Sequence, residues 1–268
     1  MNLKMNVISR RNLASSGFRI ARLAAVGLSL LVARSVQAGL IQTVEALGVQ
    51  SSTASNTTVI DFNSASTGYH YTQSFVVSPA LTVTYTGNQF INPADRYGGA
   101  VDPSNNGHSS NYFAVPSGDV TMTLSNAQAY FGIWISAADA FNQIAFYNGN
   151  TLVGSLTGTG AFLSALPSAY LGNPTPDFLG QDGPTTVQTP ENFVFVNFYA
   201  QTAADEFNKI VLSNTPGSGT TFESDNHTFS TELQAPSAVP EPSSFALLGL
   251  GGLGLAISAY RRRCNLVA

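Results

Sequence analysis

Short runs of β-branched and aromatic residues, 5–9 residues long, follow one another from Ile41 to Leu233, separated by Gly, Asn, Pro and Ser. In LTVTYT, the apolar Leu81, Val83 and Tyr85 share one face of a strand and the threonines share the other. This pattern predicts an all-β domain, a β-sandwich or jelly roll. The predicted strands contain TTVIDF, QSFVVS, LTVTYT, NYFAV, DVTMTLS, YFGIWIS, QIAFYN, TLVGSLT, NFVFVNFYA, KIVLS and HTFSTEL.

The charge of the chain is unevenly distributed. Residues 39–238 keep two basic residues, Arg96 and Lys209, and fourteen acidic ones, a net charge of −12. Such a surface repels nucleic acid and anionic lipid, so we expect no nucleic-acid partner. Solubility is the simplest explanation of the acidity. Binding of calcium, which takes carboxylate and carbonyl oxygens, is the alternative.

One stretch of the domain is repeated. ISAADAFNQIAFYN (135–148) and QTAADEFNKIVLSN (201–214) are related by a constant offset of 66 residues. We predict a strand, an A-A-D turn and a second strand in each copy, in pseudo-symmetric halves of a sandwich. The identical pairs are Ala137/Ala203, Ala138/Ala204, Asp139/Asp205, Phe141/Phe207, Asn142/Asn208, Ile144/Ile210 and Asn148/Asn214.

The repeated aspartates are candidate ligand-binding residues. Asp139 and Asp205 are each followed by an asparagine, Asn142 or Asn208. The structural interpretation is an Asx turn, in which the carboxylate accepts a backbone N–H two residues on. The functional alternative is half of a calcium site or a clamp for sugar hydroxyls. We expect the phenylalanine of each copy to cap the turn and the isoleucine to enter the core.

A second acidic cluster lies in FESDNHTF, near the end of the domain. Strand alternation predicts that Glu223, Asp225 and His227 point to one side, where they could bind a divalent cation. The spacing fits neither an EF-hand nor a zinc site, so the metal is left unknown. An acidic turn before the last strand is the alternative.

Catalysis has little support in the sequence. The nucleophile elbow, the P-loop, the dinucleotide fingerprint and H-E-x-x-H are all missing from the chain. We therefore predict no enzyme, with a glycoside hydrolase as the alternative because it needs only two suitably spaced carboxylates. Sugar binding would use exposed aromatic rings for stacking. The candidates are Trp134, Tyr97, Tyr112 and Tyr199, although Trp134 lies in an apolar strand and is expected in the core instead.

The first 38 residues have the layout of a secretory signal peptide. A basic region up to Arg22 precedes the apolar run Leu23–Ala33, and small or aliphatic residues follow at Val36 and Ala38. The apolar run is too short to remain as a membrane anchor. We predict export with cleavage after Ala38. The arginine pair at residues 10–11 leaves the twin-arginine route as an alternative.

The other end of the chain combines a proline-rich segment, an apolar helix and an arginine cluster. Pro240 and Pro242 keep the chain extended around Glu241. Phe245–Tyr260 carries no charge and would span about 24 Å as a helix. The arginines that follow would remain in the cytoplasm. We predict a single transmembrane helix that holds the exported domain outside the inner membrane.

These three elements, in this order, resemble the PEP-CTERM sorting signal. The resemblance implies that an exosortase, an integral-membrane cysteine protease-transpeptidase, recognises the signal and removes the helix. It also implies a surface or extracellular protein of a Gram-negative bacterium that makes exopolysaccharide. The residues that carry it are Pro240, Glu241, Pro242, Arg261, Arg262 and Arg263. NYFAV, FGIW, DAFNQIAFY, FNKIVLS and FESDNHTF are similar to one exosortase-dependent surface-protein family, which brings no established activity.

The predicted organisation is a signal peptide at 1–38, a β-sandwich domain at 39–238 and a sorting signal at 239–268. We expect a non-catalytic structural or adhesive component of the exopolysaccharide or biofilm matrix. The alternative is a carbohydrate-binding module, assisted by calcium. Exosortase is the expected partner during sorting, exopolysaccharide a further candidate partner, and contact with the inner membrane is transient.

Overall fold

In the computed structural model, the described residues are 39–235 without 95, 97, 103–108, 159, 173 and 175–190. The strands are β1 (Leu40–Val44), β2 (Thr58–Ile60), β3 (Gly68–Ser78), β4 (Leu81–Asn92), β5 (Tyr112–Val115), β6 (Gly118–Gln128), β7 (Tyr130–Ala138), β8 (Asn142–Asn148), β9 (Thr151–Thr157), β10 (Asn192–Ala200), β11 (Phe207–Asn214) and β12 (Phe222–Ser230). The short helices are α1 (Ala161–Ser164), η2 (Ser168–Tyr170) and η3 (Ala203–Asp205).

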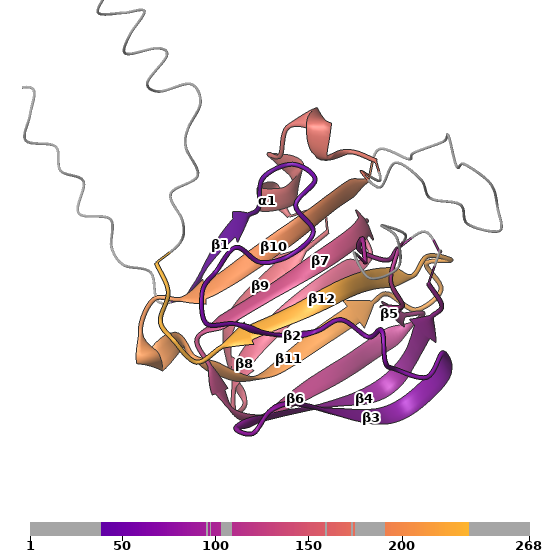
Figure 1. Ribbon diagram of the computed structural model, residues 1–268. Coiled ribbons are helices and arrows are strands. Elements are labelled where there is room, and N and C mark those ends of the chain that lie inside the picture. The colour runs from indigo at the N-terminus through magenta and orange to yellow at the C-terminus, as the bar shows by residue number, and fades with distance from the viewer. Residues whose placement is uncertain are drawn as a thin grey trace, which may run out of the picture. The chain divides into compact units, whose positions relative to one another are not determined.

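The twelve strands form one hydrogen-bonded sheet. Its order is β1-β10-β7-β12-β5-β4-β6-β11-β8-β9, with β2 paired to β12 and β3 paired to β4. The ends of this order approach each other, because Gln42 Nε2 of β1 donates a 2.9 Å hydrogen bond to the Ser155 carbonyl oxygen of β9. The sheet is therefore curled into a nearly closed, barrel-like arrangement (Figure 1).

The all-β prediction is confirmed. The strands form one continuous sheet, however, whereas a β-sandwich would have two separate sheets packed face to face. The buried strand β5 pairs with β12 through Phe113–Val115 and with β4 through Tyr112–Ala114. Hydrogen bonding therefore continues around this corner. Strand patterns in the sequence cannot reveal this, because the pairing joins segments far apart in the chain.

Aromatic side chains fill the space inside the curled sheet. Phe146 of β8 lies with its ring centroid 5.9 Å from that of Phe131 on β7 and 4.6 Å from that of Phe198 on β10. Phe207, at the start of β11, lies 5.0 Å from the same ring. Residues from opposite parts of the sheet thus pack on one another. Burial of these rings is the main stabilising contribution of the core.

The repeated sequence occupies equivalent strands. The strands that lead into the two A-A-D turns, β7 and β10, pair with each other, and so do the strands that follow, β8 and β11. The second copy begins just after β10 ends at Ala200, so it contains η3 and β11 but no first strand. Ile144 and Ile210 are both in the core, as predicted. Since β8 and β11 are antiparallel, the two A-A-D turns lie at opposite ends of this strand pair.

The predicted signal peptide and sorting segment, including Ala38 and Pro240, lie outside the described residues. The bounds of the predicted domains stay predictions. Among the described residues, no helix has the length and apolar character needed to cross a membrane.

Candidate functional site

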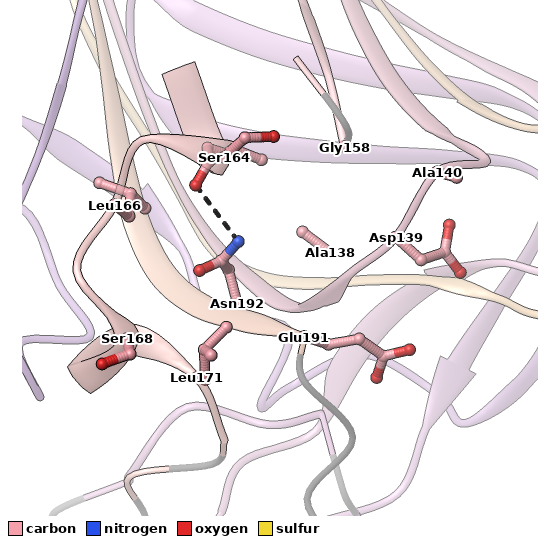
Figure 2. A pocket seen from close by; sticks show the side chains of 11 residues that line it. Ala138, Asp139, Ala140, Gly158, Ser164, Leu166, Ser168, Leu171, Glu191 and Asn192 are labelled. Carbon is pink, nitrogen blue, oxygen red and sulfur yellow. Dashed lines mark hydrogen bonds between the residues drawn. The ribbon is translucent and has the colours of Figure 1, made fainter. Parts of the chain in front are cut away.

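A pocket of about 490 Å³ opens where β7 ends and β10 begins, beside α1 and η2 (Figure 2). Its lining combines carboxylates, an amide and hydroxyls with leucine side chains. Such a mixture can hold a small polar ligand by hydrogen bonds over an apolar surface. The polar residues are Asp139, Ser164, Ser168, Glu191 and Asn192, and the leucines are Leu163, Leu166 and Leu171.

Asp139 lies at this pocket and also stabilises its own turn. Its Oδ1 accepts the Phe141 N–H at 2.7 Å, which is the predicted Asx turn. Asn142 Oδ1 accepts the Asp139 N–H at 3.0 Å. One oxygen of each side chain is thus used by the backbone. Figure 2 shows the carboxylates of Asp139 and Glu191 on the same side of the pocket.

The amide of Asn142 is unusual because it is buried and incompletely hydrogen-bonded. The residue is 4% exposed, and Nδ2 has no hydrogen-bond partner among the residues that the structure describes. It lines a small cavity of about 10 Å³, which shares Ala138, Gly158 and Leu163 with the larger pocket. A cavity of this size is at the lower limit for one water molecule, which would satisfy the amide.

The second repeated pair, Asp205 and Asn208, holds other segments of the chain. Asp205 Oδ2 accepts the Thr202 N–H at 3.0 Å and the Thr202 hydroxyl at 2.7 Å, while Oδ1 accepts the Gly39 N–H at 3.0 Å. Asn208 Oδ1 accepts the Gly149 N–H at 2.9 Å. These oxygens are therefore engaged in capping and in joining β1 to the turn.

Asp225 is fully buried and fixes the loop that follows β4. Its carboxylate accepts the Ala100 N–H at 2.9 Å, the Asn226 N–H at 2.7 Å and the Ser110 hydroxyl. Burial raises the pKa of Asp225 to about 8, although these three hydrogen bonds act in the opposite direction. Asp225 is thus a buried anchor for the loop.

Glu223 lies near the same loop and is coupled to the pocket. Burial raises the pKa of Glu223 to about 7, and the negative charge of Glu191 adds to this effect. At Gly98 an added Cβ would lie 2.8 Å from Glu223 Oε2 and 2.6 Å from the Tyr112 ring. Only glycine lets the loop approach this closely. In the part of the chain that the structure describes, no group of three or more His, Cys, Asp or Glu side chains is arranged to hold a metal ion.

The prediction that His227 shares a side with Glu223 and Asp225 is wrong. The register of β12 shifts between Asp225 and Thr228, and Asn226 has a φ of 50°. This bulge reverses the alternation and turns His227 into the core. A bulge of this kind leaves no simple pattern in a single sequence.

In the core, His227 belongs to a buried polar group. Its Nδ1 lies 2.8 Å from the Tyr85 hydroxyl, and its Nε2 lies 3.0 Å from Ser224 Oγ. Burial lowers the pKa of His227 to about 3, so the ring is neutral. Ser224 and His227 are each 0% exposed. This serine–histidine pair is closed to substrate and stabilises the core.

The aromatic residues predicted for sugar stacking are mostly buried. Tyr112 and Tyr199 are 2% and 3% exposed, so the prediction that their rings face solvent is wrong. Trp134 is 1% exposed and is buried, as its apolar strand indicated. They lie in strands that have both faces covered, and Tyr97 lies outside the described residues.

The exposed aromatic pair is Tyr69 and Tyr71 on β3, which sequence reasoning missed. The available signal in the sequence was GYHYT, in which two tyrosines separated by one residue directly follow a glycine. Glu191 and Asn192 were missed as pocket residues because they carry no motif of their own.

A comparison with protein-family models finds the PEP-CTERM protein-sorting motif at residues 238–263. This span includes every residue on which the sequence prediction rested, from Pro240 to Arg263. No curated protein and no solved structure matches the chain. The prediction of a PEP-CTERM signal is confirmed. The chain is an exosortase-targeted, exported surface protein that passes transiently through the membrane during sorting.

Proposed function

We propose that the domain is a non-catalytic structural or adhesive component of the exopolysaccharide or biofilm matrix. The sorting motif at 238–263 carries this proposal, because it sends the domain to the cell surface. Residues 39–238 contain few basic residues and carry a net charge of −12, which suits a protein that remains hydrated outside the cell.

The use of the candidate side chains supports a structural role. Asp139, Asp205 and Asp225 each accept at least one backbone N–H. Carboxylates held this way stabilise turns and loops, and their oxygens are less available for a ligand. The buried Ser224–His227 pair likewise stabilises the protein core.

The test compares cells that produce the wild-type chain with cells carrying Arg261→Gln, Arg262→Gln and Arg263→Gln together. We expect wild-type protein, without residues 245–268, in the surface and matrix fractions and the variant in the inner membrane. A strain without the protein should form a weaker matrix. A matrix of unchanged mass and cohesion in that strain would contradict the structural role.

The second candidate function is carbohydrate binding at the pocket of Figure 2. It is favoured by the combination of Asp139, Glu191 and Asn192 around one opening of about 490 Å³. Sugar hydroxyls are commonly bound by such carboxylate and amide groups, and calcium can assist.

Co-sedimentation of the exported protein with exopolysaccharide, in calcium and then in EGTA, tests this candidate. Glu191→Gln should weaken saturable binding, whereas Asp119→Asn, an exposed aspartate on β6, should leave it unchanged. Equal binding by both variants would exclude the pocket. Release of reducing ends during incubation would instead indicate the glycan hydrolase.

A further inference from the structure

The pocket of Figure 2 offers a ligand mainly hydrogen-bond acceptors. Within the described residues Asp139 uses Oδ1, which accepts the Phe141 N–H, so Oδ2 remains for a ligand. Asn192 donates through Nδ2 to the Leu163 carbonyl oxygen at 3.5 Å, and its Oδ1 is a further acceptor. Glu191 adds a second carboxylate on the same side of the pocket as Asp139. Such a lining suits a ligand group that is rich in donors.

The charges at this pocket are all negative. The described residues that line it include Asp139 and Glu191 but no lysine, arginine or histidine. The pKa of Glu223 is raised by burial first and by the charge of Glu191 second, so Glu223 lies within electrostatic reach of the pocket. The domain around the pocket carries a net charge of −12. These charges disfavour an anionic ligand and favour a cationic group.

A buried amide beside the pocket lacks a hydrogen-bond acceptor. Asn142 is 4% exposed, and its Nδ2 donates to no acceptor among the described residues. It lines the cavity of about 10 Å³ that shares Ala138, Gly158 and Leu163 with the pocket. A ligand hydroxyl, or a water that the ligand holds there, would accept from this amide and remove the cost of leaving it unpaired. This favours a ligand that carries hydroxyl groups.

Leucine side chains complete the lining. Leu163, Leu166 and Leu171 supply apolar surface beside the acceptors. A sugar ring has C–H groups on its faces and polar groups around its rim, so it can lie against leucines while its polar groups reach the carboxylates. The volume of about 490 Å³ is within the range of small-molecule sites, roughly 300–1,000 Å³.

We propose that this pocket binds a glycan residue that carries a free ammonium group, as in an amino sugar whose amine is not acetylated. The ammonium group donates to the carboxylates of Asp139 and Glu191, a charge-assisted pairing. The C–H groups of the ring contact the leucines, and a hydroxyl accepts from the Asn142 amide. The inference rests on the second candidate function, carbohydrate binding at this pocket, and names the class of sugar.

Two trisaccharides of the same length and linkage test the proposal. One is the trisaccharide of glucosamine, which carries free amines, and the other is its fully N-acetylated form, which is neutral. Isothermal titration calorimetry of the exported protein compares them at about pH 6, where the amines are charged. Salt at about 150 mM screens long-range attraction to the acidic surface. We expect the amine form to bind about tenfold more tightly.

Substitutions that remove one charge at a time locate the binding site. Glu191→Gln and Asp139→Asn should each weaken binding of the amine form about tenfold, because each removes a charge-assisted hydrogen bond. Asp139→Asn keeps an oxygen that accepts the Phe141 N–H, so the turn should be preserved. Asp119→Asn removes the same charge from an exposed site on β6 and should leave the affinity unchanged. An equal loss with Asp119→Asn would reflect general attraction by the acidic surface and would overturn the proposal.

The same titrations distinguish this inference from the function on which it rests. If the N-acetylated form binds at least as tightly as the amine form, and Glu191→Gln weakens that binding, the ammonium assignment is overturned and carbohydrate binding at the pocket stands. If neither form binds, both are overturned. Saturable calcium binding that Glu191→Gln and Asp139→Asn abolish, without binding of either trisaccharide, would show a metal site and overturn the proposal.

Discussion

The two copies of the repeated sequence, 135–148 and 201–214, share key residues and differ in what surrounds them. In the first copy, Asp139 borders an open pocket and Phe141 is 40% exposed. In the second copy, Asp205 is 5% exposed and Phe207 is 0% exposed. The aspartate and phenylalanine of the first copy therefore lie at the rim of a pocket, whereas those of the second copy are buried.

The difference arises from what covers each turn. Antiparallel pairing of β8 with β11 separates the turns, and the start of β1 meets only the second one through the Gly39 N–H. Near the first turn the pocket remains open. Local sequence thus determines the turn, while distant segments determine burial. The comparison predicts unequal effects for matched substitutions.

Phe207→Ala and Phe141→Ala should show the largest contrast. Removing a buried phenylalanine costs about 3–5 kcal/mol of unfolding free energy. Removing Phe141, which is 40% exposed, should cost less, about 1–2 kcal/mol. Urea unfolding of the mature protein, followed by the fluorescence of its single tryptophan, Trp134, measures both. Equal losses would mean that burial does not distinguish the copies.

A second buried aspartate, Asp225, extends the comparison to pH. Its pKa is raised to about 8 in the folded protein, above the usual value of 3.8. Folding therefore takes up a proton between these two pH values, and stability should fall as pH rises from about 4 to about 8, by roughly 6 kcal/mol at about 1.4 kcal/mol per pKa unit.

Asp225→Asn should flatten this part of the pH–stability curve. His227 has a lowered pKa and contributes the opposite slope below about pH 6.5, but it does so in both proteins. The difference between the two curves therefore reports Asp225. Asp119→Asn, at an exposed site, is the control and should leave the slope unchanged. A wild-type slope in Asp225→Asn would contradict the burial of this charge.

Asp205→Ala and Asp139→Ala should differ by a smaller amount. Asp205 accepts three hydrogen bonds, from Thr202 and Gly39, and its removal should cost about 2 kcal/mol. Asp139 accepts one, from Phe141, and its removal should cost about 1 kcal/mol. The same urea titration compares them. A larger loss with Asp139→Ala would show that the turn beside the pocket contributes more to stability than the turn at Asp205.

The local parts of the fold could be predicted from sequence. LTVTYT lies in β4 with Leu81, Val83 and Tyr85 buried, as its alternation indicated. The Asx turn at Asp139 followed from residue type and spacing, and Thr202–Asp205 has the spacing of a capping box. These features depend on residues close together in the chain.

The parts that depend on distant neighbours could not be predicted. Closure of the sheet through β5 depends on its partners β4 and β12, and the reversal at Asn226 depends on a bulge. The pocket joins the end of β7 to the start of β10, more than 50 residues later. Strand periodicity shows which residues can share a face, but it does not show what will cover that face.

Asn214→Ala and Asn148→Ala provide the smallest contrast. Asn214 is 1% exposed, and its Nδ2 donates to the carbonyl oxygens of Pro116 at 3.1 Å and Thr220 at 2.6 Å. Losing these bonds should cost about 1 kcal/mol, because two carbonyls lose a donor where water has little access. Asn148 is exposed at the end of β8, so its loss should change unfolding by less than about 0.5 kcal/mol. If both variants lost the same stability, the cost would come from the strand ends themselves, and the burial of the second copy would not explain it.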